Sequence, residues 1–287
     1  MAIIPEKALS LAIPPLVQDY DDRDTMLYAL GIGIGHDITD PGQLGFVYER
    51  GLKAVPTMAV VLGETMDWVH DPQLGVDVNQ CLHGEERVIL HRPLAPEGRV
   101  VGQTRVVGVA DKGAGRGALV HSRKELRDAD TGELIATTQR TAFARADGGF
   151  GGVHGESPAP LPPLPDRAPD LSCDLPTMTQ AALFYRLSGD RIPLHADPEI
   201  ARAAGFDRPI LHGLCSLGMA CHAILRLVCD YDPARIAEIG CRFSAPVFPG
   251  ETLRVELWRE GAAVQFRALV AERGVVAVTN GHAALRG

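Results

Sequence analysis

The chain has 287 residues, of which 46% are hydrophobic and 22% are charged, and its formal net charge is −8. This composition is typical of a globular protein with enough apolar material for a sizeable core. The net negative charge argues against a nucleic-acid-binding protein, which would normally carry a basic surface. The length exceeds that of most single domains, so we expect two domains or one fused pair.

No sequence pattern predicts export or membrane insertion. The N-terminal residues lack the basic stretch and unbroken apolar run of a signal peptide, and no apolar run reaches membrane-spanning length. The cysteines form no CxxC pair, which favours free thiols in a reducing compartment and therefore a cytoplasmic protein. They are Cys81, Cys173, Cys215, Cys221, Cys229 and Cys241.

The first half of the chain begins its regular structure with a helical stretch around Glu49 to Leu62. Strand-like runs follow it. They are Arg87–Leu90, Gln103–Ala110, Ala118–Arg127 and Leu134–Ala144.

A change in composition separates the two halves. Residues 148–169 pass from glycines to a proline run, which favours extended, semi-rigid backbone that joins neither a sheet nor a helix. We therefore predict an N-terminal domain over residues 1–150, a linker over 151–170 and a C-terminal domain over 171–287.

The second half contains clearer helix signals. Asp197 and Pro198 predict the start of a short helix, and Gly205 its end. Apolar residues at helical spacing predict a longer helix from about Gly213 to Val228. Strands separated by glycine turns follow and indicate an α+β fold in which an antiparallel sheet wraps a helix. They are Arg242–Val247, Thr252–Trp258, Val264–Val270 and Val275–Ala283.

The two halves share three short matches in the same order, which indicates two copies of one fold. The matched segments begin at Tyr28 and Tyr185, at Ala54 and Ile210, and at Pro93 and Pro246, so their offsets are 157, 156 and 153 positions.

Two segments of the second half carry the candidate chemistry. Asp190 and His195 flank a tight proline turn, and a carboxylate and an imidazole that converge on one water can move its proton. The alternative is that both residues only shape the loop. Gly213 begins the long helix directly after His212, and the unpaired N–H groups of a helix start suit a developing enolate oxygen.

The run YRLSGD…PLHADPEIARAAGFDRPILHGLCSLG resembles the signature of the MaoC-like, or type 2, (R)-specific enoyl-CoA hydratases. RFSAPVFPGETL and, in the first half, YALGIG, LHGEERVILHRPL and GGFGG extend this resemblance over nearly the whole chain. It implies two tandem hotdog folds, each an antiparallel sheet around a long central helix. It also implies reversible hydration of trans-2-enoyl-CoA to (R)-3-hydroxyacyl-CoA, with Asp190 and His195 as catalytic dyad and the Gly213 N–H as oxyanion donor.

The chain departs from the family pattern GDxNPLH at one position, where Ile192 replaces the usual asparagine. Loss of one hydrogen bond there costs roughly 1–3 kcal/mol, or about tenfold to a hundredfold in rate. Ile192 is therefore a candidate pocket wall. In the first half, Gly33 and Ile38 stand at the positions equivalent to Asp190 and His195. That half is expected to be catalytically silent, and the resemblance implies that it accommodates the acyl chain of the substrate.

Coenzyme A is anionic, so nearby arginines are candidate contacts for the acyl-CoA substrate. We predict Arg191, Arg208 and Arg242 for this role, and Ile192 and His212 as further substrate-binding residues. No cofactor is implied beyond the coenzyme A of the substrate, and no metal. The Gly31-x-Gly33-x-Gly35 run lacks dinucleotide-loop spacing, and the histidines and cysteines between His212 and His222 form no closed ligand set.

The resemblance also implies a homodimer. Two other functions remain open. One is a hydratase or dehydratase for bulky acyl-CoA, such as steroid side-chain or branched intermediates. The other is a catalytically weak acyl-thioester-binding protein in which the asparagine was lost together with turnover.

Overall fold

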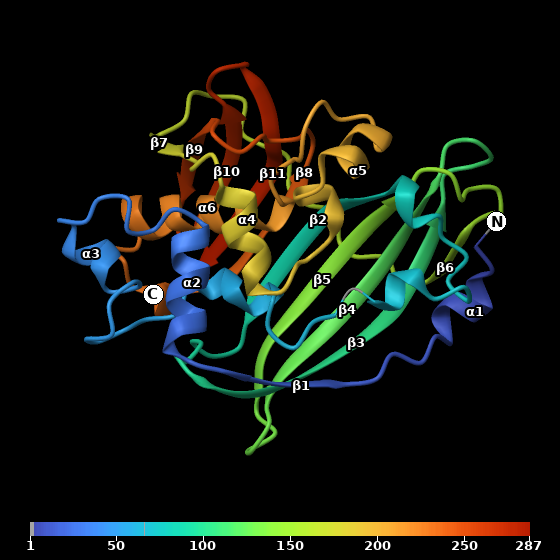
Figure 1. The fold of residues 1–287 in the computed structure, drawn as a ribbon, viewed down its shortest axis with the longest axis horizontal. Coiled ribbons are helices and arrows are strands. Elements are labelled where there is room, and N and C mark those ends of the chain that lie inside the picture. Colours follow the sequence, from blue (N-terminus) through green and yellow to red (C-terminus); the bar gives the residue numbers. More distant parts are fainter. Residues whose placement is uncertain (1–2, 66) are drawn as a thin grey trace.

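The computed structural model describes residues 3–65 and 67–287. It contains one continuous sheet whose strand order is β1-β3-β4-β5-β2-β8-β11-β10-β9-β7, with β6 paired to β3 at the side. The sheet consists of two five-stranded halves with matching strand order, joined by the antiparallel β2–β8 pair (Figure 1). The α+β fold and the internal duplication are therefore confirmed.

The strands agree well with the predicted runs, although most are longer. In the first half they are β1 (Leu16–Tyr20), β2 (Cys81–Leu90), β3 (Gly98–Asp111), β4 (Ala118–Asp128), β5 (Leu134–Ala144) and β6 (Val153–Gly155). In the second half they are β7 (Leu171–Pro176), β8 (Ile236–Phe243), β9 (Thr252–Glu260), β10 (Ala263–Val270) and β11 (Val275–Leu285).

Two strand predictions were wrong in detail. The strand predicted over Arg242–Val247 begins earlier, at Ile236, and ends at Phe243. It cannot extend through Pro246, because proline lacks the N–H that a ladder position needs. The glycine- and proline-rich linker was expected to join no sheet, yet Val153–Gly155 pairs with β3. These residues precede the prolines, so their N–H groups are available. The domain boundaries themselves stay a prediction.

The helices differ between the halves. They are α1 (Pro5–Leu9), α2 (Asp22–Gly31), α3 (Pro41–Leu44), α4 (Ala181–Tyr185), α5 (Pro198–Ala203) and α6 (Gly213–Leu227). Short 3-10 segments are η1 (Pro56–Val60), η2 (Asp67–His70), η3 (Val78–Gln80), η4 (Arg186–Ser188), η5 (Pro193–His195) and η6 (Pro233–Arg235). Of these, α6 is the long central helix of the C-terminal half, and its residues from Leu214 to Leu225 are buried.

The prediction of a helical stretch around Glu49 to Leu62 was wrong. The first half forms only the five-residue η1 there. Gly63 has a φ of 58°, and a Cβ on it would lie 2.7 Å from the Gly102 backbone, so the chain turns away here. The Lys124 ammonium of β4 then binds the freed carbonyl oxygens of Ala59, Val60 and Leu62 at 3.0, 3.1 and 2.7 Å. A buried cation thus takes the place of further helical turns.

The C-terminal elements that hold the candidate site form as predicted. The Asp197 side chain accepts from the backbone N–H groups of Glu199 and Ile200, which caps α5. Gly205 follows this helix with a φ of 90°. On α6, Gly218 lets the two halves pack closely, because a Cβ there would lie 2.5 Å from the Ile32 side chain.

All six cysteines are free thiols, as predicted. Among the described residues, no helix is long and apolar enough to cross a membrane.

Candidate active site

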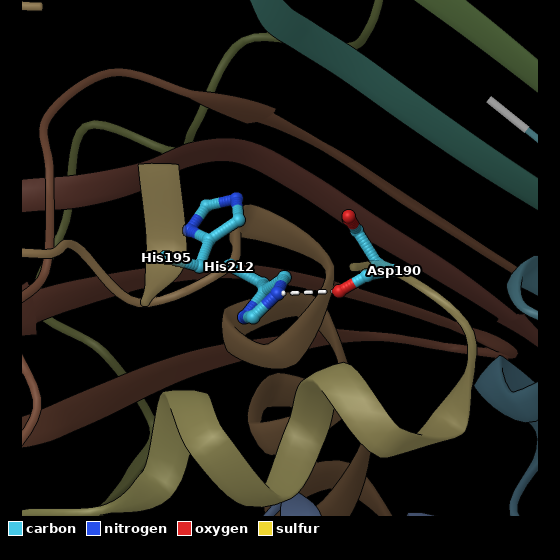
Figure 2. Close-up of side chains that lie close together, drawn as sticks. All are labelled: Asp190, His195 and His212. Carbon is cyan, nitrogen blue, oxygen red and sulfur yellow. Dashed lines mark hydrogen bonds between the residues drawn. The ribbon is translucent and has the colours of Figure 1, made fainter. Parts of the chain in front are cut away.

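Asp190, His195 and His212 meet between the loop before α5 and the start of α6 (Figure 2). One carboxylate oxygen and one ring nitrogen from each histidine all lie within 4.8 Å of one another. Both imidazoles are buried, whereas Asp190 is partly exposed. The structure therefore brings together the two predicted dyad residues and adds His212 as an immediate neighbour.

The loop fixes Asp190 through its own backbone. Gly189 has a φ of 133°, a conformation that favours glycine, and it turns the chain just before the carboxylate. The N–H of Ile192 donates to the Asp190 Oδ1 at 3.3 Å. Position 192 thus supports the carboxylate by its main chain, although its side chain offers no hydrogen bond.

The hydrogen bonds of His195 define its tautomer. Its Nδ1 lies 2.9 Å from the carbonyl oxygen of Ile210, which can only accept, so Nδ1 carries the proton. Burial lowers the pKa of His195, outweighing the nearby Asp190 charge. The neutral ring therefore presents the lone pair of Nε2, which is the arrangement that a general base requires.

His212 is also neutral. Its Nε2 donates to the backbone oxygen of Asp190 at 3.1 Å (Figure 2), and burial together with His195 lowers its pKa to about 3. Its ring stacks on that of His195, with centroids 3.7 Å apart and planes at 26°. Its Nδ1 is buried and has no hydrogen-bond partner among the described residues.

Three ligand-type groups at this spacing raise the question of a metal ion. The two imidazoles lie almost face to face, and a ring nitrogen directs its lone pair within its own ring plane. Nearly parallel planes direct these lone pairs side by side rather than toward one centre. The arrangement fits a water held between acceptors better than a tetrahedral metal site, and the predicted lack of a metal stays a prediction.

Gly213 lies at the N-terminus of α6, where no side chain caps the described helix. A Cβ at this position would lie 3.2 Å from the ring of Phe243, so glycine lets this ring pack closely against the start of the helix. An N–H at the start of a 15-residue helix is a suitable donor for an oxyanion.

The three predicted arginines are exposed. Arg191 is exposed, and the Arg208 guanidinium lies 5.0 Å from the ring centroid of Phe248. Arg242 donates to the Glu85 carboxylate at 2.7 Å through its Nε. Their role in binding coenzyme A stays a prediction.

Sequence reasoning missed several residues next to the site. The ring of Tyr185 lies 4.9 Å from that of His212. Arg140 of β5 is buried, and its pKa is raised against the effect of burial, chiefly by the charge of Glu86, with a smaller contribution from that of Asp190. Arg140 lies within a predicted strand, but residues on both faces of that strand are buried, so alternation alone does not point to it.

Comparison with known proteins connects this geometry to one group of enzymes. Residues 161–282 match the model of the MaoC like domain, and residues 18–146 match that of the MFE-2 hydratase 2 N-terminal domain. Enoyl-CoA hydratase ChsH3 of Mycobacterium tuberculosis is 40% identical over 99% of this chain and 96% of its own.

Solved structures agree. A MaoC-like dehydratase from Phytophthora capsici has a TM-score of 0.86 and 37% identity, with 98% of each chain covered. A Mycobacterium tuberculosis protein described as having a double hotdog fold has a TM-score of 0.56 over 96% of this chain and 97% of its own. At 17% identity this second similarity concerns the fold alone.

Proposed function

Because this chain belongs to the MaoC-like hydratase family and is a hydro-lyase, we propose that it hydrates trans-2-enoyl-CoA reversibly to (R)-3-hydroxyacyl-CoA. The observation that carries the proposal is the neutral His195, which has a ring nitrogen within 4.8 Å of an Asp190 carboxylate oxygen and stacks on His212, directly before the uncapped start of α6. The (R) configuration rests on the resemblance of the sequence motif.

The proposed reaction uses one water. Asp190 orients it, and His195 Nε2 takes a proton as the oxygen bonds to C3 of the enoyl group. The electron pair of the C2–C3 double bond shifts toward the thioester, whose oxygen accepts a hydrogen bond from the Gly213 N–H. The imidazolium, stabilised by the Asp190 carboxylate, then returns its proton to C2. Atoms and charge balance, and the dyad is regenerated.

An apolar cavity of about 240 Å³ provides space for the acyl chain. It lies between residues 30–36 of the first half and the second half, and Cys215 and Met219 of α6 contribute to its wall. Cys215 is two residues after Gly213, so the cavity begins close to the proposed thioester site. Burial raises the pKa of Cys215 far above its usual range, which suits a wall residue rather than a nucleophile.

The test follows the loss of enoyl-thioester absorbance with crotonyl-CoA and a longer trans-2-enoyl-CoA, with chiral analysis of the product. We expect turnover and an (R) product. An (S) product would contradict the stereochemical proposal, and no turnover with either substrate would contradict the reaction. The homodimer and the cytoplasmic location stay predictions, to be checked by light scattering and by fractionation.

A further inference from the structure

His212 occupies the N-cap position of α6 without using its side chain as a cap. Its backbone oxygen accepts from the N–H groups of Cys215 and Ser216 at 3.1 and 3.3 Å, which begins the helix. Serine, threonine, aspartate and asparagine are preferred at this position, because their side chains bind the free N–H groups of the first turn. The His212 side chain makes no such bond. Helix capping therefore does not account for a histidine here.

The side chain of His212 binds the catalytic loop instead. Its Nε2 lies 3.1 Å from the backbone oxygen of Asp190, which can only accept, so Nε2 carries the proton and donates (Figure 2). This bond spans 22 positions of the sequence and ties the main chain of Asp190 to the residue before Gly213. The Ile192 N–H separately holds the carboxylate. Main chain and side chain of Asp190 thus each have their own donor.

The ring of His212 also contacts the other member of the dyad. It stacks on the ring of His195 with centroids 3.7 Å apart, and the Tyr185 ring lies 4.9 Å from it. His195 is itself held by the carbonyl oxygen of Ile210, two residues before His212. One side chain therefore contacts both residues of the dyad.

Stability gives little reason for an imidazole at this position. His212 is 1% exposed, and its Nδ1 has no hydrogen-bond partner among the described residues. A buried polar atom without a partner destabilises a fold. Phenylalanine would keep ring contacts with His195 and Tyr185 and would bury no such atom. It would lack the Nε2–H, so this donor is what distinguishes histidine here.

We propose that His212 is a positioning residue for hydration, whose Nε2–H fixes the main chain of Asp190 so that the carboxylate is directed at the water. This inference rests on the proposed hydratase function. His212 acts through Asp190 and does not touch the reacting atoms. Loss of the donor should therefore lower kcat, whereas KM should change little because the Gly213 N–H and the acyl cavity stay in place.

The test measures kcat and KM for crotonyl-CoA in the wild type, His212→Phe and His212→Gln. Phenylalanine keeps the ring and removes the donor, so kcat should fall about tenfold to a hundredfold, with KM within about twofold of the wild type. Glutamine places an amide N–H near the position of Nε2 and removes the ring, so it should restore most of the lost kcat. The opposite order, or equal kcat in the two variants, would overturn the inference.

His222 provides a matched control on the same helix. It is 2% exposed, and its Nδ1 also has no hydrogen-bond partner among the described residues. Its Nε2 lies 3.4 Å from the Tyr231 hydroxyl rather than at the catalytic loop. His222→Phe should therefore leave kcat unchanged. A fall in kcat equal to that of His212→Phe would overturn the inference, because loss of any buried imidazole on α6 would then have the same effect.

Nitrogen-15 NMR of histidine-labelled wild-type protein tests the hydrogen bond without a substitution, and it decides the question if His212→Phe does not fold. The His212 signals, assigned by their loss in His212→Gln, should show the Nε2–H tautomer. The Nδ1–H tautomer would overturn the inference, because Nε2 could then not donate to the Asp190 carbonyl oxygen.

Asp190→Asn separates this inference from the function on which it depends. Activity that persists in Asp190→Asn contradicts the proposed function itself. Activity that disappears there, together with wild-type kcat in His212→Phe, contradicts only the inference.

Discussion

The two halves of this molecule have the same strand order, but the helical element that packs on the sheet differs between them. The C-terminal sheet packs on the 15-residue α6, whose N-terminus provides Gly213. The N-terminal sheet packs on the five-residue η1, whose last carbonyls are bound by the buried Lys124. A duplicated fold can thus keep its sheet while one copy has a long helix with an uncapped start and the other has buried charges in its place.

Removing the Lys124 ammonium from its carbonyl and Glu64 partners should have the largest effect on stability. Lys124→Met leaves three carbonyl oxygens and Glu64 without their cation in the protein interior. Removing one partner from such a buried set costs about 3–5 kcal/mol. Urea unfolding should show this loss, whereas Lys112→Met, at an exposed position, should be neutral. Equal stability of both variants would mean that the cation does not substitute for the missing helix.

Ile192→Asn tests what the side chain at position 192 contributes to the loop that holds Asp190. An amide there adds a hydrogen-bonding group beside a carboxylate that the backbone already holds. We expect kcat/KM for crotonyl-CoA to rise about tenfold, from a gain of roughly 1–2 kcal/mol. Ile200→Asn on the neighbouring α5 is the control, because Ile200 is 45% exposed. A decrease for Ile192→Asn would instead make the isoleucine a required part of the pocket.

Met178→Trp tests where the acyl chain lies. Met178 lines the 240 Å³ cavity and is itself 39% exposed, so a larger side chain can fill the cavity with little damage to the fold. KM for a long enoyl-CoA should rise about fivefold, while KM for crotonyl-CoA stays unchanged. Leu183→Trp, at a residue that is 52% exposed, should change neither value. If Met178→Trp left the chain-length preference unchanged, this cavity would be excluded as the binding site of the acyl chain.

Part of the acid sensitivity should come from α6, in addition to the contributions of the buried His195 and His212. His222, a buried residue of this helix, has its pKa lowered to about 4, mainly by burial. An unfolded histidine titrates near 6.5, so between these values the unfolded chain binds more protons and stability falls as the pH falls. We expect His222 to contribute a loss of about 1 kcal/mol between pH 7.5 and 5.5. His222→Gln should reduce this difference in urea unfolding, and an unchanged difference would exclude His222 as its source.

Strand positions, the duplication and the proximity of Asp190 and His195 could be predicted from the sequence because they depend on local patterns. The run Leu134–Ala144 was predicted with its exact ends. The helix at Glu49–Leu62 could not be excluded, since its loss depends on the contact of Gly63 with Gly102 across the fold.

We propose that the chemistry resides in the Asp190 loop of the C-terminal half. Its most direct test compares crotonyl-CoA hydration by Asp190→Asn with that by Asp37→Asn, an exposed aspartate in the corresponding N-terminal loop. We predict that Asp190→Asn loses about 10²–10⁴-fold in kcat while Asp37→Asn keeps wild-type activity. Wild-type turnover in a folded Asp190→Asn variant would contradict the account.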